Sequence, residues 1–207
     1  MYPQLLLASS SRGRQELLHE AQIHFRVIAQ YADERSYSWD MPVDQLVLSL
    51  AALKMEHAIF PDDITDNTLC IVTADTLVQD SRGIIYGKPD NSEDARVMIQ
   101  ALCDEKVRIV TGMRVERRTK DGDVWVTDKV YEVVDETYAV FAIPESWIAW
   151  FIDRAASVHV AGAVIFDGVG LRFAQYMQGS PSTVRGLPIY QLQLALEQLG
   201  FFEAHVE

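Results

Sequence analysis

The chain has 207 residues, of which 49% are hydrophobic and 23% charged, and its formal net charge is −12. This length is enough to bury a sizeable core, and the composition is that of an ordinary globular protein. The acidic balance argues against broad binding to nucleic acid or to an anionic membrane, because both are negatively charged. A small anionic substrate remains compatible with it, provided that local cations or a metal ion meet that substrate.

Nothing in the sequence points to a membrane or to an oxidising compartment. No run of about 18 apolar residues is present, so a membrane span is not expected. The N-terminal segment has no basic stretch before its short apolar run, which argues against a signal peptide. Cys70 and Cys103 lie in apolar surroundings without a CxxC pair, a pattern typical of reduced core residues. We therefore expect a cytoplasmic protein.

The first predicted elements are a buried strand over 4–9, a serine-rich turn and a helix that begins at Arg12. The serines at 9–11 are expected to cap this helix with their hydroxyls. Backbone N–H groups at a helix N-terminus also bind phosphate, and Arg14 would add a guanidinium fork. A serine-rich turn before a helix is usually only a cap, so both interpretations stay open on these residues alone.

A second strand is predicted over 24–29, and a polar loop with Asp33 and Glu34 leads to a helix over 42–60. The apolar residues of that helix repeat with helical periodicity, and Lys54 falls within their stripe. Such a lysine either extends its ammonium to the edge of the apolar surface or points into an anion site. The first alternative is slightly favoured.

Residues 70–89 are predicted to form a hairpin around which the chain is organised. An apolar run ends in Ala74-Asp75-Thr76, residues 80–83 supply a turn, and the chain returns to Gly87-Lys88-Pro89. This brings Asp75 and Lys88 to the mouth of the hairpin. A carboxylate and an ammonium there suit metal-assisted phosphate chemistry, although a surface salt bridge is the commoner explanation for such a pair.

The second half continues to alternate helices with strands. The predicted elements are a helix over 91–104, a strand over 106–119, one or two strands over 124–143, a helix from Pro144 and a final helix over 189–199. Trp147, Trp150 and Phe151 are expected in the core or in a subunit interface. This alternation predicts an α/β protein with a mixed sheet, and no clear linker divides it.

Short motifs run through nearly the whole chain in a specific order. They are LASSSRGRQELL, DE at 33–34, LAALK ending at Lys54, ADTLV, GKP, VTG, AGA at 161–163 and GLPI at 186–189. Each is unspecific alone, but together the chain resembles the Maf family of nucleoside triphosphate pyrophosphatases. The family is α/β, related in fold to inosine triphosphate pyrophosphatases, and releases pyrophosphate and a monophosphate with a divalent cation.

The resemblance implies one domain over 1–207, with a mixed twisted sheet flanked by helices and two lobes around a central cleft. It also implies the residues of a nucleotide site. The substrate-binding positions are Ser9, Arg14, Thr76 and Asp167, and the catalytic cluster is Glu34, Lys54, Asp75 and Lys88. Glu34 and Asp75 would hold Mg²⁺ or Mn²⁺, and Asp75 corresponds to the family's general base or metal-associated carboxylate.

Three departures from the family pattern bear on the substrate. Arg12-Gly13-Arg14 replaces the usual Pro-Arg-Arg, so one arginine of the first phosphate contact is lost or displaced. Asp167 stands where the pyrimidine-directed subgroup has Gln, and the loop over 179–188 is similar to the subgroup active on 7-methyl-GTP. A carboxylate can accept from N1–H and the amine of guanine, although an aspartate before a glycine is as often a turn residue.

The expected function is therefore hydrolysis of a modified nucleoside triphosphate such as 7-methyl-GTP. The alternatives are a dTTP/UTP pyrophosphatase of the same family and a nucleotide-binding regulator of septum formation with little turnover. A phosphomonoesterase ranks last, because no matching motif is present. The expected partner is the nucleoside triphosphate, with no nucleic acid or membrane, and the resemblance also suggests a homodimer.

Overall fold

The computed structural model describes residues 4–155 and 157–202, and the chain divides into two compact units. The first unit takes its described residues from Met1–Asp75, Gly112–Val134 and Gly186–Glu207. The second unit is made of Thr76–Thr111 and, where described, Asp135–Arg185. The predicted single domain with two lobes around a cleft stays a prediction.

The strands form a seven-stranded mixed sheet in the order β2-β1-β3-β5-β6-β7, with β4 also on β3. Their bounds are β1 (Gln4–Leu7), β2 (Arg26–Val27), β3 (Thr68–Gln79), β4 (Ile85–Tyr86), β5 (Lys106–Asp121), β6 (Val124–Phe141) and β7 (Ala174–Gln178). β1 pairs in parallel with β2 and β3, whereas β4 and β7 pair antiparallel with β3 and β6. The predicted α/β class with a mixed sheet flanked by helices is confirmed.

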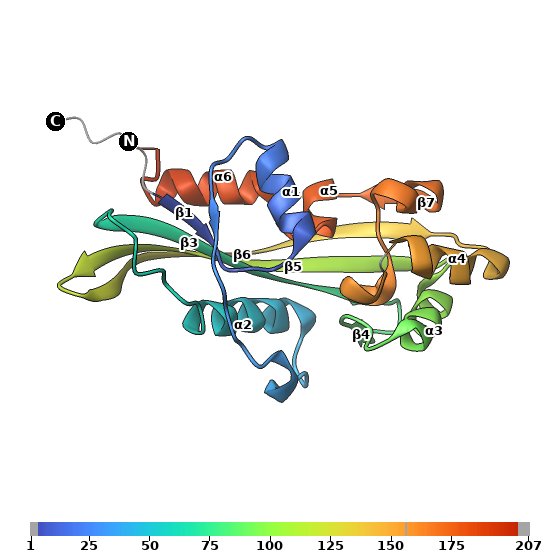
Figure 1. Ribbon diagram of the computed structural model, residues 1–207. Helices are drawn as coiled ribbons and strands as arrows, with labels where there is room; N and C mark the ends of the chain where they lie inside the picture. Colours follow the sequence, from blue (N-terminus) through green and yellow to red (C-terminus); the bar gives the residue numbers. More distant parts are fainter. Residues whose placement is uncertain (1–3, 156, 203–207) are drawn as a thin grey trace. The chain divides into compact units, whose positions relative to one another are not determined.

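In the first unit, helices cover both faces of the parallel strands. α1 (Arg12–Glu20) and α6 (Ile189–Gln198) lie on one face, and α2 (Val43–Glu56) lies on the other (Figure 1). Successive side chains of a strand point to opposite faces, so Leu5 and Leu7 join one core cluster while Leu6 joins another. A strand buried on both faces reads as a continuous apolar run, which is why QLLL could be recognised in the sequence.

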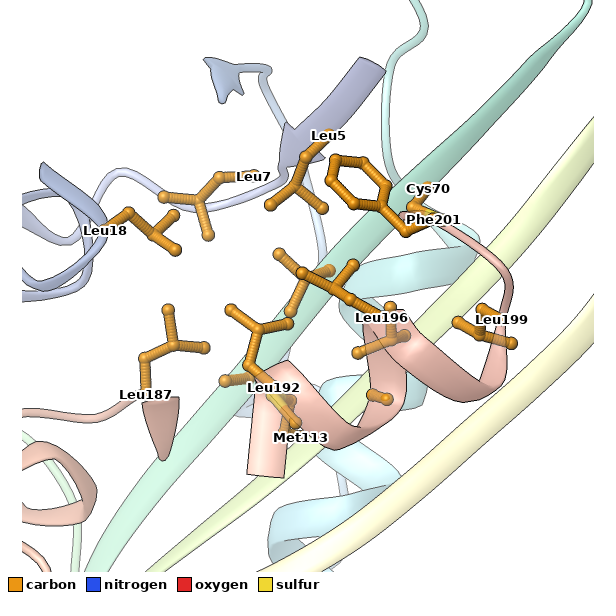
Figure 2. Close-up of a cluster of buried hydrophobic side chains, with 14 of the residues drawn as sticks. Leu5, Leu7, Leu18, Cys70, Met113, Leu187, Leu192, Leu196, Leu199 and Phe201 are labelled. Carbon is orange, nitrogen blue, oxygen red and sulfur yellow. The ribbon is translucent and has the colours of Figure 1, made fainter. Parts of the chain in front are cut away.

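Figure 2 shows the larger core cluster of this unit, with side chains from β1, α1 and α6 turned toward one another. The labelled members are Leu5, Leu7, Leu18, Cys70, Met113, Leu187, Leu192, Leu196, Leu199 and Phe201. Cys70 is buried as a free thiol, and burial raises its pKa to about 12. Its assignment as a reduced core residue is confirmed.

The second unit packs α3 (Ser92–Leu102), α4 (Glu145–Ala155) and α5 (Pro181–Val184) with β4, β7 and the neighbouring ends of the long strands. Its core centres on Phe141, whose ring makes edge contacts with Phe151 and Phe166 at centroid distances of 5.4 and 5.2 Å. α3 begins as predicted, because Asn91 Oδ1 accepts from the backbone N–H groups of Glu93 and Asp94.

Several local predictions are wrong for identifiable reasons. α2 ends at Glu56 rather than at residue 60, because Ala58 leaves the helix to form a β-bridge with Gln30. Ser11 is the N-cap of α1 but makes no side-chain cap bond. The predicted loop over 179–188 contains the short helix α5. Trp147 is 39% exposed and so is not a core residue, and its alternative place in a subunit interface stays a prediction. In the described part of the chain, no helix has the length and apolarity that crossing a membrane requires.

Candidate active site

A buried lysine joins two acidic residues in the first unit. Lys54 lies in the last turn of α2, and its Nζ donates to Oδ1 of Asp75 on β3. The same Nζ lies 3.2 Å from Oε1 of Glu34. Glu34 opens a short 3-10 turn, Glu34–Ser36, which Asp33 caps by accepting from the backbone N–H of Arg35. The structure therefore brings together three of the four predicted catalytic residues.

This cluster is largely shielded from solvent. Lys54 and Asp75 are each 5% exposed, whereas the side chain of Glu34 is 39% exposed. An isolated charge is costly to bury, so the ammonium and the two carboxylates depend on one another. The ammonium of Lys54 therefore does not extend to an apolar edge but pairs with two carboxylates, and its role in a phosphate site stays a prediction.

One oxygen of the cluster lacks a protein partner. Asp75 Oδ2 is buried and accepts no hydrogen bond within the described part of the chain. Buried carboxylate oxygens are normally hydrogen-bonded, and exceptions concentrate where a ligand, an ion or chemistry supplies the partner. Asp75 Oδ2 is therefore the acceptor in this unit that a water molecule or a cation fits best.

Close packing holds α2, and with it the backbone of Lys54, against strands β3 and β5. Thr73 Oγ1 donates to the carbonyl of Ala51 at 2.7 Å, which ties β3 to α2 two residues before Asp75. On β5, a Cβ added to Gly112 would lie only 2.6 Å from the carbonyl carbon of Val47. Only glycine permits this approach, so Gly112 of the VTG motif has a steric reason for its presence.

The predicted phosphate contacts are held within the first unit. Arg14 Nη1 donates to Ser9 Oγ at 3.0 Å, and Arg14 Nε donates to the carbonyl of Gly186 at 2.7 Å. Ser9 Oγ also accepts from the backbone N–H of Ser11, the N-cap residue of α1, whose own side chain makes no cap bond. Burial lowers the pKa of Arg14, and the charges of Asp75 and Glu34 oppose that shift. Two of its donors are therefore used by the protein.

The other predicted residues belong to the second unit. The β3–β4 hairpin that leads to Lys88 forms as predicted, with Val78 opposite Tyr86. Because Lys88 and Asp75 fall in different units, their proximity stays a prediction. Thr76 Oγ1 lies 2.9 Å from Thr111 Oγ1.

Asp167 is paired within the second unit. Its Oδ2 lies 3.2 Å from Nε of Arg185, the C-cap residue of α5. The sequence predicts either a guanine ligand or a turn for this aspartate, and gives no sign of an arginine partner. An arginine 18 residues away is no local signal, and only the tertiary fold brings the two together.

Two clusters were therefore found only in the structure. In one, the carbonyl of Gly186 accepts a hydrogen bond from Arg14. In the other, Thr76 contacts the hydroxyl of Thr111, which in turn bonds the carbonyl of Thr183. Thr111 and Gly186 lie in the VTG and GLPI motifs, so the motifs marked the right segments without assigning a role to these residues.

Together, the mixed sheet and the buried cluster of acids and cations define an α/β protein with a polar site on a core strand, β3. A family model described as Maf-like protein matches residues 4–199. The chain belongs to the Maf family.

Three similar proteins are each named dTTP/UTP pyrophosphatase. The one from Anaeromyxobacter dehalogenans (strain 2CP-C) is 32% identical over 201 residues, which cover 97% of this chain and 96% of that protein. The one from Bacillus thuringiensis subsp. konkukian (strain 97-27) is 30% identical over 97% of this chain and 98% of its own. The one from Syntrophus aciditrophicus (strain SB) is 30% identical over 95% and 90%.

Proposed function

We propose that this protein hydrolyses dTTP and UTP to the nucleoside monophosphate and pyrophosphate. Its family and the names of its relatives make it a nucleoside triphosphate pyrophosphatase. The observation that carries the proposal is the buried Lys54 between Glu34 and Asp75, with one acceptor of Asp75 left without a protein donor. The proposed preference for dTTP and UTP is taken from the names of the relatives.

In the proposed reaction, a water molecule attacks the α-phosphorus of the nucleotide. The bond from this phosphorus to the oxygen that bridges to the β-phosphorus breaks, and pyrophosphate leaves with the bonding electrons. Asp75 Oδ2 orients the water and accepts its proton, while Lys54 holds Oδ1 and fixes the carboxylate plane. Each turnover consumes one water and yields one monophosphate and one pyrophosphate.

The residues present fit a divalent cation that arrives with the nucleotide. No group of three or more His, Cys, Asp or Glu residues suited to a metal ion occurs among the described residues. Mg²⁺ commonly binds through one or two carboxylates together with substrate phosphates and water, and Glu34 with Asp75 supplies such a pair. When bound there, Mg²⁺ or Mn²⁺ would neutralise phosphate charge and polarise the α-phosphate.

The charges of the cluster support the proposal of such a cation. Arg14 and Lys54 carry two positive charges, and Glu34 and Asp75 carry two negative charges, so the four side chains sum to zero. A triphosphate that approached them alone would gain little net attraction. The cation is proposed to supply the remaining positive charge, and the catalytic role of Lys88 in the second unit stays a prediction.

The pairing of Asp167 supports a pyrimidine substrate over 7-methyl-GTP. The charge of Arg185 competes for the carboxylate that would otherwise accept from guanine. The relatives named above also favour dTTP and UTP, so the expected preference for 7-methyl-GTP is not supported. The cytoplasmic location and the homodimer stay predictions.

A product assay on a nucleotide panel tests the proposal. Purified protein is incubated with Mg²⁺ or Mn²⁺ and dTTP, UTP, CTP, GTP or 7-methyl-GTP, and pyrophosphate is measured separately from orthophosphate. We expect pyrophosphate from dTTP and UTP at the highest kcat/KM. Orthophosphate as the first product would indicate a phosphomonoesterase. Tight binding without turnover would favour the nucleotide-binding regulator.

A further inference from the structure

A series of hydrogen-bonded threonine hydroxyl groups begins at Thr76 in the second unit. Thr76 lies on β3, and its Oγ1 is 2.9 Å from Oγ1 of Thr111 on β5. Thr111 Oγ1 donates to the carbonyl of Thr183 at 2.7 Å, and Thr183 Oγ1 donates in turn to Oδ2 of Asp135. Thr111 and Thr183 are fully buried, so water does not compete for these hydrogen bonds.

Counting protons fixes the direction of the first hydrogen bond. A threonine hydroxyl carries one proton and two lone pairs. The proton of Thr111 is committed to the carbonyl of Thr183, so Thr111 can only accept from Thr76. The proton of Thr76 therefore points at Thr111, and every further hydrogen bond of Thr76 Oγ1 is one that it accepts.

We propose that Thr111 is a positioning residue that makes Thr76 an acceptor for the imide N3–H of uracil and thymine. The inference rests on the proposed function, because it assigns recognition of the substrate's base to Thr76, a predicted substrate-binding residue. Uracil and thymine donate at N3, whereas cytosine carries an unprotonated acceptor there. A fixed acceptor therefore favours the first two bases and disfavours the third.

The same fold supplies a matched control. Thr137 Oγ1 donates to the carbonyl of Ser180 at 3.0 Å, and Thr137 is also fully buried. Thr111→Val and Thr137→Val each remove a buried hydroxyl that bonds a carbonyl of the same segment, 180–183. Both should lower stability to a similar degree, but only the first releases the proton of Thr76.

The test measures dissociation constants of UMP and CMP by isothermal titration calorimetry for wild type, Thr111→Val, Thr111→Ser and Thr137→Val. We expect wild type to bind UMP more tightly than CMP. In Thr111→Val the hydroxyl proton of Thr76 is free to turn toward the base, so the ratio of the two dissociation constants should fall about tenfold. Thr111→Ser keeps the hydroxyl and should keep the preference, as should Thr137→Val.

The inference is overturned if wild type does not prefer UMP, if Thr111→Val keeps the wild-type ratio, or if Thr137→Val shifts it equally. Because the measurement needs no turnover, it is independent of pyrophosphate release. A protein that binds UMP selectively through Thr76 but releases no pyrophosphate from UTP would refute the proposed function and leave this inference intact.

Discussion

The ammonium of Lys54 donates a hydrogen bond to Oδ1 of Asp75, which links the last turn of α2 to β3 within the first unit. Both side chains are buried, so each charge is stabilised chiefly by the other and by nearby Glu34. Both the stability of the protein and the proposed chemistry therefore depend on this pair, and mutations can separate the effect on stability from the effect on activity.

Replacing Lys54 should destabilise the protein. Lys54→Met leaves the carboxylate of Asp75 buried without its counter-charge, and such losses cost about 3–5 kcal/mol. We expect urea unfolding to report this decrease, together with loss of pyrophosphate release. The exposed Lys129→Met provides the control and should change the free energy of unfolding by less than about 0.5 kcal/mol.

The double variant Lys54→Met/Asp75→Leu distinguishes an unpaired charge from a simple packing defect. Removing both charges should restore much of the lost stability, because apolar residues often replace a buried ion pair without a net cost. The protein would remain inactive. A Lys54→Met variant as stable as wild type would show that the pair is not coupled as the geometry indicates.

Glu116 should make stability depend on pH. Burial raises the pKa of this carboxyl, but hydrogen bonds and charge from Arg114 and Arg118, with a bond from Thr127, outweigh burial and lower it. A lowered pKa in the folded state adds stability above the ordinary value of 4.5, and this is lost as pH falls through the folded value. Glu116→Gln should therefore cost about 1–3 kcal/mol at pH 7.

The pH series provides the check. The difference between wild type and Glu116→Gln should shrink as pH falls below about 4.5, whereas the exposed Glu56→Gln should show little difference at any pH. A difference that stays constant down to about pH 3 would mean that the charge of Glu116 contributes nothing to folding.

Gly112→Ala should be strongly destabilising for a purely steric reason. The new Cβ would meet backbone atoms of Val47 and Leu48 at 2.6–2.7 Å, so α2 or β5 has to shift. Thermal unfolding should show a loss of about 1–3 kcal/mol, and the displaced α2 should also lower activity through Lys54. At Gly122, which has open space and φ of 60°, Gly122→Asn should be tolerated. Equal stability of the two variants would argue against the tight packing at Gly112.

Asp167→Ala should not change the choice of base. Its carboxylate is paired with Arg185, so we expect UTP to remain preferred over 7-methyl-GTP. The ratio of kcat/KM for the two nucleotides is the measurement. A wild type that prefers 7-methyl-GTP, together with an Asp167→Ala variant that loses this preference, would restore the guanine-recognition hypothesis that the sequence suggested.

The sequence alone predicted an element correctly where one kind of sequence signal determines it. Long apolar runs such as that of β3 identified the core strands, and Asn91 before an acidic first turn identified the start of α3. Motif order identified Glu34, Lys54 and Asp75 together. The failures concern partners that only the fold supplies: Arg185 for Asp167, the carbonyl of Gly186 for Arg14, and the strand-like departure of Ala58 that ends α2.

The most direct test of the central claim is single-turnover release of pyrophosphate from UTP by wild type and by Asp75→Asn. Asparagine keeps the shape of aspartate but accepts a proton far less readily, so a folded Asp75→Asn should be slower by about a thousandfold. Release of pyrophosphate at the wild-type rate by a folded Asp75→Asn would contradict the assignment of the Glu34–Lys54–Asp75 cluster as the active site.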